Sequence, residues 1–144
     1  EQVAIRLRAI RKKTTTVSIS IGYSRFEEST SFRGQMKIEP TNQTEELQKY
    51  VISLFRKKYN GGAVRSISVF YSSFVDKNIT MLSLFDDPEE ILKKERLQTA
   101  IDAIRSQFGF TTLQKANSLT SASRSIARSK LVGGHSAGGL DGLK

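Results

Sequence analysis

Apolar and polar residues alternate with two different periods in the first part of this chain. Val3, Leu7 and Ile10 recur at helical spacing, which predicts an amphipathic helix over residues 1–13 with cations on its other faces. From Thr16 to Tyr23 the period falls to two, because apolar residues alternate with Thr, Ser and Gly. This pattern predicts a strand with one buried face.

The same two periods return further along the chain. Residues 32–38 alternate again and predict a second strand, which pairs with the first as a hairpin across a loop at 24–30. Pro40 is expected to end this strand, and Asn42 and Glu45 have the spacing of a capping box at the start of a helix. The apolar stripe of that helix is Leu47, Tyr50, Val51, Leu54 and Phe55.

A third strand is predicted over residues 64–74, after Asn60-Gly61-Gly62 ends the second helix. The elements follow in the order helix, strand, strand, helix, strand. This order predicts an α+β fold in which an antiparallel sheet carries two helices on one face. The opposite face stays open. Period-two alternation places on it a set of hydroxyl, amide and cationic side chains: Ser18, Ser20, Arg33, Gln35, Lys37, Ser66 and Ser68.

An open sheet face of this composition can contact phosphates and sugars, and can position a nucleic-acid duplex without reading its bases. Ser24, Arg25 and Arg65, near the ends of the strands, complete the candidate nucleic-acid-binding set. An ordinary solvated sheet face is the alternative, although such faces more often include acidic residues.

Net charge supports a polyanionic partner. The chain has 144 residues and a formal charge of +9. Residues 1–75 carry +7, residues 76–109 carry −2, and residues 110–144 carry +4. A basic body and a basic tail joined by a mildly acidic connector favour nucleic acid as the partner, against the alternative of a merely solvated basic surface.

The connector contains a short apolar cluster, Met81-Leu82-Ser83-Leu84-Phe85, followed by acidic Asp86-Asp87. Five residues are too few for a helix that hides its own apolar face, so the cluster is either the end of a strand or an exposed contact. Pro88 and the acids after it predict a helix over 89–109. We therefore divide the chain into a domain at 1–75, a linker at 76–88, a helix at 89–109 and a basic Ser/Gly-rich tail at 110–144.

Groups for catalysis are not apparent in the sequence. The chain has no cysteine and one histidine, His135, between glycines in the tail, so neither a common zinc site nor a histidine-based nucleophile pair is expected. Asp86 and Asp87 are neighbours along the chain, whereas a two-metal site needs carboxylates from separate elements. We expect no cofactor in this chain. Without a membrane-length apolar run or an N-terminal h-region, we expect a cytoplasmic protein.

Several strings in this order of elements resemble the C-terminal part of Y-family translesion DNA polymerases, especially the bacterial UmuC-like (ImpB/MucB/SamB) UV-damage repair group. The resemblance covers most of the chain. The matching strings are Val17-Ser-Ile-Ser-Ile-Gly-Tyr-Ser24, Phe32-Arg-Gly-Gln35, Glu39-Pro-Thr-Asn42, Val64-Arg-Ser-Ile67, Leu82-Ser-Leu-Phe-Asp86 and Gly133-Gly-His135.

The resemblance implies that residues 1–75 are a little finger domain, which grips DNA beside a catalytic palm during error-prone lesion bypass in DNA repair and the SOS response. The cluster Met81–Phe85 would be the peptide that binds the sliding clamp, usually written Gln-Leu-x-Leu-Phe. Met81 stands where Gln is usual, which predicts weaker binding. The palm and its Mg²⁺ would belong to a longer parent polymerase.

The little finger usually begins with a strand before its first helix, and the sequence here starts at that helix. An unpaired sheet edge is therefore expected, which a second copy of the chain could fill as a homodimer. An alternative from another class is a non-catalytic RNA-binding or protein-interaction module with a ferredoxin-like sandwich. RNA-binding sheets stack bases on exposed aromatics, and here only Phe70 has the required parity. A standalone small-molecule enzyme is the weakest alternative.

Overall fold

The computed structural model describes residues 1–26, 28, 30–76, 87–121, 123–129 and 131. The chain divides into two compact units, Glu1–Pro88 and Glu89–Lys144, which are treated separately below. In the described part of the chain, no helix is both long enough and apolar enough to cross a membrane.

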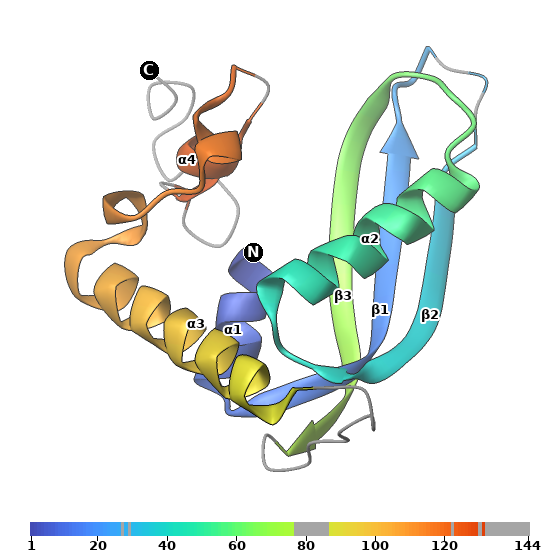
Figure 1. The fold of residues 1–144 in the computed structure, drawn as a ribbon. Helices are drawn as coiled ribbons and strands as arrows, with labels where there is room; N and C mark the ends of the chain where they lie inside the picture. The colour runs from blue at the N-terminus through green and yellow to red at the C-terminus, as the bar shows by residue number, and fades with distance from the viewer. Residues whose placement is uncertain (27, 29, 77–86, 122, 130, 132–144) are drawn as a thin grey trace. The chain divides into compact units, whose positions relative to one another are not determined.

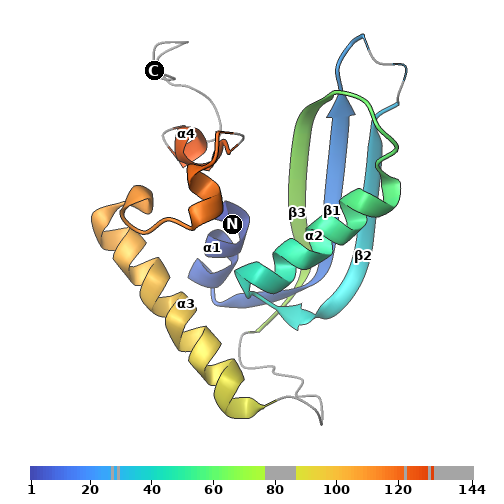
Figure 2. The same ribbon diagram turned by 45° about the horizontal axis from the view of Figure 1, so that its top comes forward.

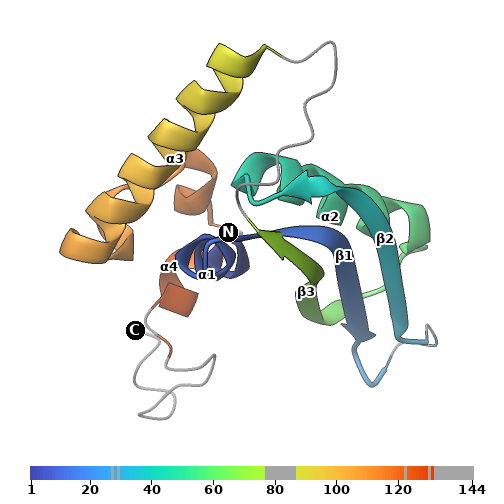
Figure 3. The ribbon, with the colours of Figure 1, turned by 90° about the horizontal axis from the view of Figure 1, so that it is seen from below.

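The first unit follows the predicted order of elements. Its elements are α1 (Gln2–Ala9), β1 (Lys12–Tyr23), β2 (Phe32–Thr41), α2 (Thr44–Lys58) and β3 (Val64–Asp76). The strands form an antiparallel sheet in the order β2-β1-β3, and α2 crosses one side of this sheet (Figures 1 and 2). The view from below shows α2 and the three strands as two layers (Figure 3). The predicted α+β class is confirmed.

The first helix is shorter than its predicted range of 1–13. Helix α1 ends at Ala9, and Arg11 has a left-handed backbone with φ 53°. Residues from Lys12 onward belong to β1. The run Thr14-Thr15-Thr16 explains the difference, because β-branched residues lose side-chain freedom in a helix and suit a strand.

The second strand is longer than predicted, because β2 continues through Pro40 to Thr41. Proline is tolerated there since β2 is an edge strand, where one side of the backbone needs no partner. The predicted capping box is wrong. Asn42 is buried and donates from Nδ2 to the carbonyl of Lys12, while the Thr41 hydroxyl bonds to Glu46 and accepts from the backbone N–H of Gln43.

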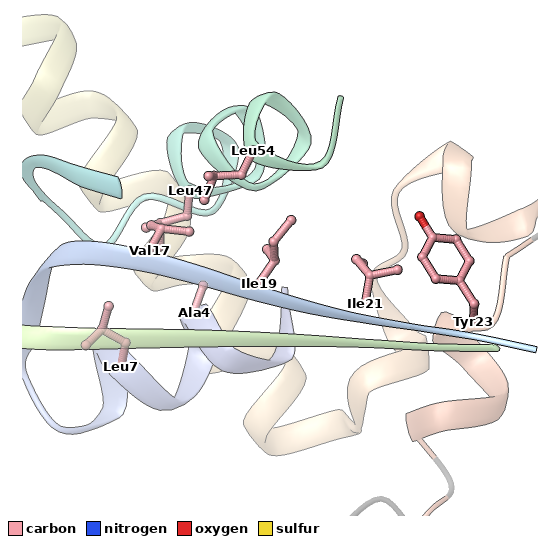
Figure 4. Close-up of a cluster of buried hydrophobic side chains, with 8 residues drawn as sticks. All are labelled: Ala4, Leu7, Val17, Ile19, Ile21, Tyr23, Leu47 and Leu54. Atoms are coloured by element: carbon pink, nitrogen blue, oxygen red, sulfur yellow. The ribbon is translucent and has the colours of Figure 1, made fainter. Parts of the chain in front are cut away.

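The core lies between the inner face of the sheet and the two helices. Its buried side chains come from three elements: Ala4 and Leu7 of α1, Val17, Ile19, Ile21 and Tyr23 of β1, and Leu47 and Leu54 of α2 (Figure 4). The predicted alternation of β1 is thus observed, with one row of its residues in the core and the next row on the outer face.

Arg8 links α1 to the start of α2 through two hydrogen bonds. Its Nη1 donates to the carbonyl of Asn42 at 2.7 Å and to Oγ1 of Thr44 at 3.0 Å. Arg8 also acts on Tyr71 of β3. Burial raises the pKa of the Tyr71 phenol above its usual value of 10.0, and the positive charge of Arg8 opposes this rise.

The two edge strands differ in how they are covered. On β2, Nζ of Lys58 donates to the carbonyl of Arg33 at 3.0 Å, and the Lys58 stem lies so close to Gly34 that a Cβ there would be 3.2 Å from Lys58 Cδ. On β3, no described strand pairs with the outer edge. Ile67 lies opposite fully buried Ile21 in the register, yet is 55% exposed.

Helix α3 (Pro88–Phe108) belongs to the second unit from its second residue onward. Two short 3₁₀ turns, η1 (Phe110–Thr112) and η2 (Ala116–Leu119), and α4 (Ser125–Ser129) follow it. The predicted helix after the connector is observed as α3, and Gly109 follows it with φ 92°. Buried Arg105 holds the next turn, since its guanidinium donates twice to the carbonyl of Leu113 and lies 4.8 Å from the ring centroid of Phe110.

Candidate nucleic-acid interface

The register of the sheet brings most of the predicted contact residues into rows across the outer face. Residues directly opposite each other on antiparallel strands share a face. Ser20 lies between Arg33 of β2 and Ser68 of β3, and Ser18 lies between Gln35 of β2 and Phe70 of β3. Ser66 lies opposite Gly22 at one end of β1.

A third row, which the sequence analysis did not include in full, lies beyond these two. Thr16 of β1 is opposite Lys37 of β2 and Ser72 of β3. Thr16 and Ser72 continue the same period-two alternation as Ser18 and Ser68. Extending that alternation by one further pair would have identified both residues from the sequence.

Side-chain length changes across the rows. The central strand contributes half-buried small residues, Thr16, Ser18 and Ser20, whereas β2 contributes the long, exposed side chains of Arg33, Gln35 and Lys37. The outer face is therefore low along β1 and bordered by longer side chains on β2. Short side chains thus follow the central strand, and two cations lie on the β2 side of it.

The loop end of the sheet carries the remaining predicted residues. The backbone N–H of Ser24 donates to the carbonyl of Ala63, which ties the start of the β1–β2 loop to the start of β3. Arg25 and Arg65 are both exposed at this end, and Arg65 lies where the β1–β3 register shifts. They extend the positive charge beyond the rows.

Acidic residues are scarce in this region of the unit. The three rows contain no Asp or Glu. Glu39 is exposed on β2, but it lies beyond Lys37 in the stretch where the β1–β2 register shifts. The rows thus combine hydroxyl, amide and cationic groups, which suits phosphate and sugar oxygens.

Two further points of the sequence analysis concern metal binding and the clamp peptide. In the described segments, no group of three His, Asp or Glu side chains could hold a metal ion. The predicted clamp-binding residues, Met81, Leu82, Ser83, Leu84 and Phe85, lie outside the described residues, as do Asp86 and His135.

Comparison with known proteins assigns the chain to a family. Residues 1–84 match the impB/mucB/samB family C-terminal domain, so the chain belongs to this family. The predicted resemblance to the C-terminal region of a Y-family polymerase is confirmed.

Individual relatives extend the match beyond the family domain. The chain is 38% identical to the putative UV-damage repair protein UvrX of Bacillus subtilis and 35% identical to DNA polymerase IV 2 of the same organism. It is 31% identical to DNA polymerase IV 2 of Halalkalibacterium halodurans. Each match covers 94% of the chain and 32% of the relative, so the chain spans about a third of the length of these proteins. No solved structure matches the chain.

Proposed function

We propose that this chain is the DNA-gripping and clamp-tethering part of an error-prone, lesion-bypass DNA polymerase that acts in DNA repair and the SOS response. The observation that carries the DNA-binding role is the alignment of Arg33, Lys37 and Gln35 beside a row of small hydroxyl residues on one open sheet face. The family match and the names of the relatives, UV-damage repair protein and DNA polymerase IV, agree with it.

The physical basis is contact with the backbone of duplex DNA. Strands in a sheet are about 4.8 Å apart, so the three-stranded face is about 10 Å wide and accommodates one phosphate backbone over β1. Cations of β2 then lie beside the phosphates, and hydroxyls of β1 donate to them. Such contacts release counterions and hold the duplex regardless of its sequence.

Salt dependence tests the DNA-binding role. The double variant Arg33→Ala with Lys37→Ala should weaken duplex binding and lower the slope of log affinity against log salt by about 2, because each phosphate contact contributes about 0.9 to that slope. Fluorescence anisotropy between low and moderate salt measures it. The matched control, Lys49→Ala with Lys57→Ala, removes the same charge from exposed positions on α2 and should leave the slope nearly unchanged. Salt-independent binding by the native chain, or equal effects of the two double variants, would contradict the proposal.

Clamp tethering rests on the sequence of Met81–Phe85 alone. Leu82, Leu84 and Phe85 would insert into a hydrophobic groove of the sliding clamp, as anchors of a short recognition peptide. Tethering raises the effective concentration of the polymerase at the primer terminus. Leu84→Ala with Phe85→Ala should abolish co-migration with the clamp, Ser83→Ala should not, and Met81→Gln should strengthen it. Unchanged co-migration of the double variant would refute the assignment.

Polymerase activity is proposed for a longer parent protein in the cytoplasm, where it would act on DNA with Mg²⁺ held by a palm. We propose that Mg²⁺ binds in the palm of that parent, in the part of its length that this chain does not span. The present chain would supply positioning and tethering.

A homodimer is the proposed state of this chain on its own. The outer edge of β3 has no partner strand in the described residues, and exposed Ile67 lies beside it. A strand from a second copy could satisfy the free backbone groups of that edge. Scattering at high concentration should give the mass of a dimer, and Ile67→Lys should shift it toward a monomer. A monomeric mass for the native chain would exclude this state.

A further inference from the structure

Phe70 differs chemically from its neighbours on the proposed DNA-binding face. It occupies the middle row, opposite Ser18 and in line with Gln35, and its side chain is 55% exposed. Isolated exposed apolar residues are common on protein surfaces. What singles out Phe70 is its place within the three rows, whose other side chains are hydroxyls, an amide and cations.

The two borders of this face therefore have different chemistry. The β2 border presents Arg33 and Lys37, while no large hydrophobic side chain of β2 is exposed. The β3 border presents the phenyl ring of Phe70 between Ser68 and Ser72. A DNA backbone has a similar asymmetry across its width, because the charged phosphate oxygens lie on its outer side and the sugar rings, which have an apolar surface, lie on the side of the bases. A backbone lying over β1 with its phosphates toward β2 brings its sugars toward β3.

We propose that Phe70 packs against the deoxyribose rings of the backbone held over β1, and so supplies a part of the binding affinity that does not depend on salt. This inference rests on the proposed DNA-binding function and adds the orientation of the backbone on the sheet. Sugar rings are favoured over bases as the contact because bases in a duplex are already stacked. Sheets that stack unpaired bases use several aromatics together, whereas the three rows here contain one.

The experiment measures affinity for one DNA duplex across a range of salt concentrations. Phe70→Ala should weaken binding about fivefold at every salt concentration and leave the salt slope unchanged, because the lost contact is apolar. Phe70→Leu should retain most of the affinity, since a sugar ring needs an apolar surface and not specifically an aromatic one. The control is Ile52→Ala, a loss of another exposed apolar side chain from α2, which lies on the inner side of the sheet, and it should bind as the native chain does.

Other outcomes would separate the competing explanations. Full affinity of Phe70→Ala, while the native chain binds duplex with a steep salt slope, would overturn this inference and leave the DNA-binding proposal intact. Failure of the native chain to bind duplex would overturn both. If Phe70→Leu is as weak as Phe70→Ala, and the loss is confined to single-stranded DNA or RNA, the ring stacks on unpaired bases instead. Circular dichroism melting of each variant establishes that it is folded.

Discussion

The two edge strands of the sheet, β2 and β3, are covered to different extents. Strand β2 lies under α2, has a proline within it, and has the carbonyl of Arg33 bonded by Lys58. Strand β3 is 13 residues long, has no described partner on its outer edge, and exposes Ile67, Phe70 and Phe74. A strand with exposed apolar side chains and free backbone groups is suited to contact with other molecules. Strand β2 is thus the better covered edge of the sheet, and β3 is the more open one.

Truncating one apolar side chain on each side should test this comparison most strongly. Leu54 of α2 is 5% exposed and packs near Gly34 of β2, so Leu54→Ala should lower the free energy of unfolding by about 3 kcal/mol. Ile67→Ala on β3 should cost less than about 1 kcal/mol, because much of that side chain is already in water. Urea denaturation gives both values. Equal losses of unfolding free energy would show that β3 is as tightly packed as β2.

Removing the bond between the helices should have an intermediate effect. Arg8→Ala deletes the donors to the Asn42 carbonyl and the Thr44 hydroxyl, which α1 uses to hold the start of α2. The expected loss is about 2 kcal/mol, since hydrogen bonds from a charged group are stronger than neutral ones. Arg6→Ala, at an exposed position of the same helix, is the control and should change stability little. If both variants melt at the same temperature, the bonds of Arg8 contribute nothing.

Shortening Lys58 should expose the edge of β2 at little cost in stability. Lys58→Ala removes an exposed hydrogen bond, so the expected change is about 0.5 kcal/mol or less. The informative readout is association, because the carbonyl of Arg33 becomes free to pair with another strand. Light scattering should show larger species for Lys58→Ala than for the exposed-site control Lys49→Ala. Identical scattering would mean that Lys58 does not protect this edge.

The pH dependence of stability should report the buried phenol of Tyr71 on β3. Because its pKa is raised in the folded chain, the unfolded chain loses this proton first, near pH 10.0. Its contribution to stability is therefore complete below pH 10.0 and is lost as the pH rises through the folded-state pKa. For Tyr71→Phe, the free energy of unfolding, measured by denaturant titration, should fall less steeply with pH above pH 10.0 than it does for the native chain. The same pH profile in both proteins would assign the alkaline loss to other groups.

Sequence periodicity was enough to predict the elements and the two faces of the sheet. Val17, Ile19 and Ile21 alternate strictly, and Leu47 and Leu54 are two helical turns apart, so local spacing determined which sides would be buried. The limits of the elements were less predictable. Pro40 can lie within β2 because that strand is at the edge of the sheet. The side chain of Asn42 donates to the carbonyl of Lys12, which is distant in the sequence, and does not cap its own helix.

The candidate site was predictable in composition but not in alignment. Alternation identified Ser18, Arg33 and Ser68 as members of the outer face. Their arrangement in rows depends on the register, which shifts between Thr14 and Thr16 on one side and between Gly22 and Tyr23 on the other. A one-residue change in pairing moves every side chain to the opposite face, so the place of Phe70 beside Ser18 required the structure.

The hydrogen bond from Lys58 to the carbonyl of Arg33 also bears on the size of the assembly proposed above. Sheets that are open at both edges can add subunit after subunit and grow into filaments. In this unit Lys58 covers part of the β2 edge, so the proposed strand addition is expected at β3. With that edge paired, the proposed assembly is expected to end as a dimer rather than grow into a filament.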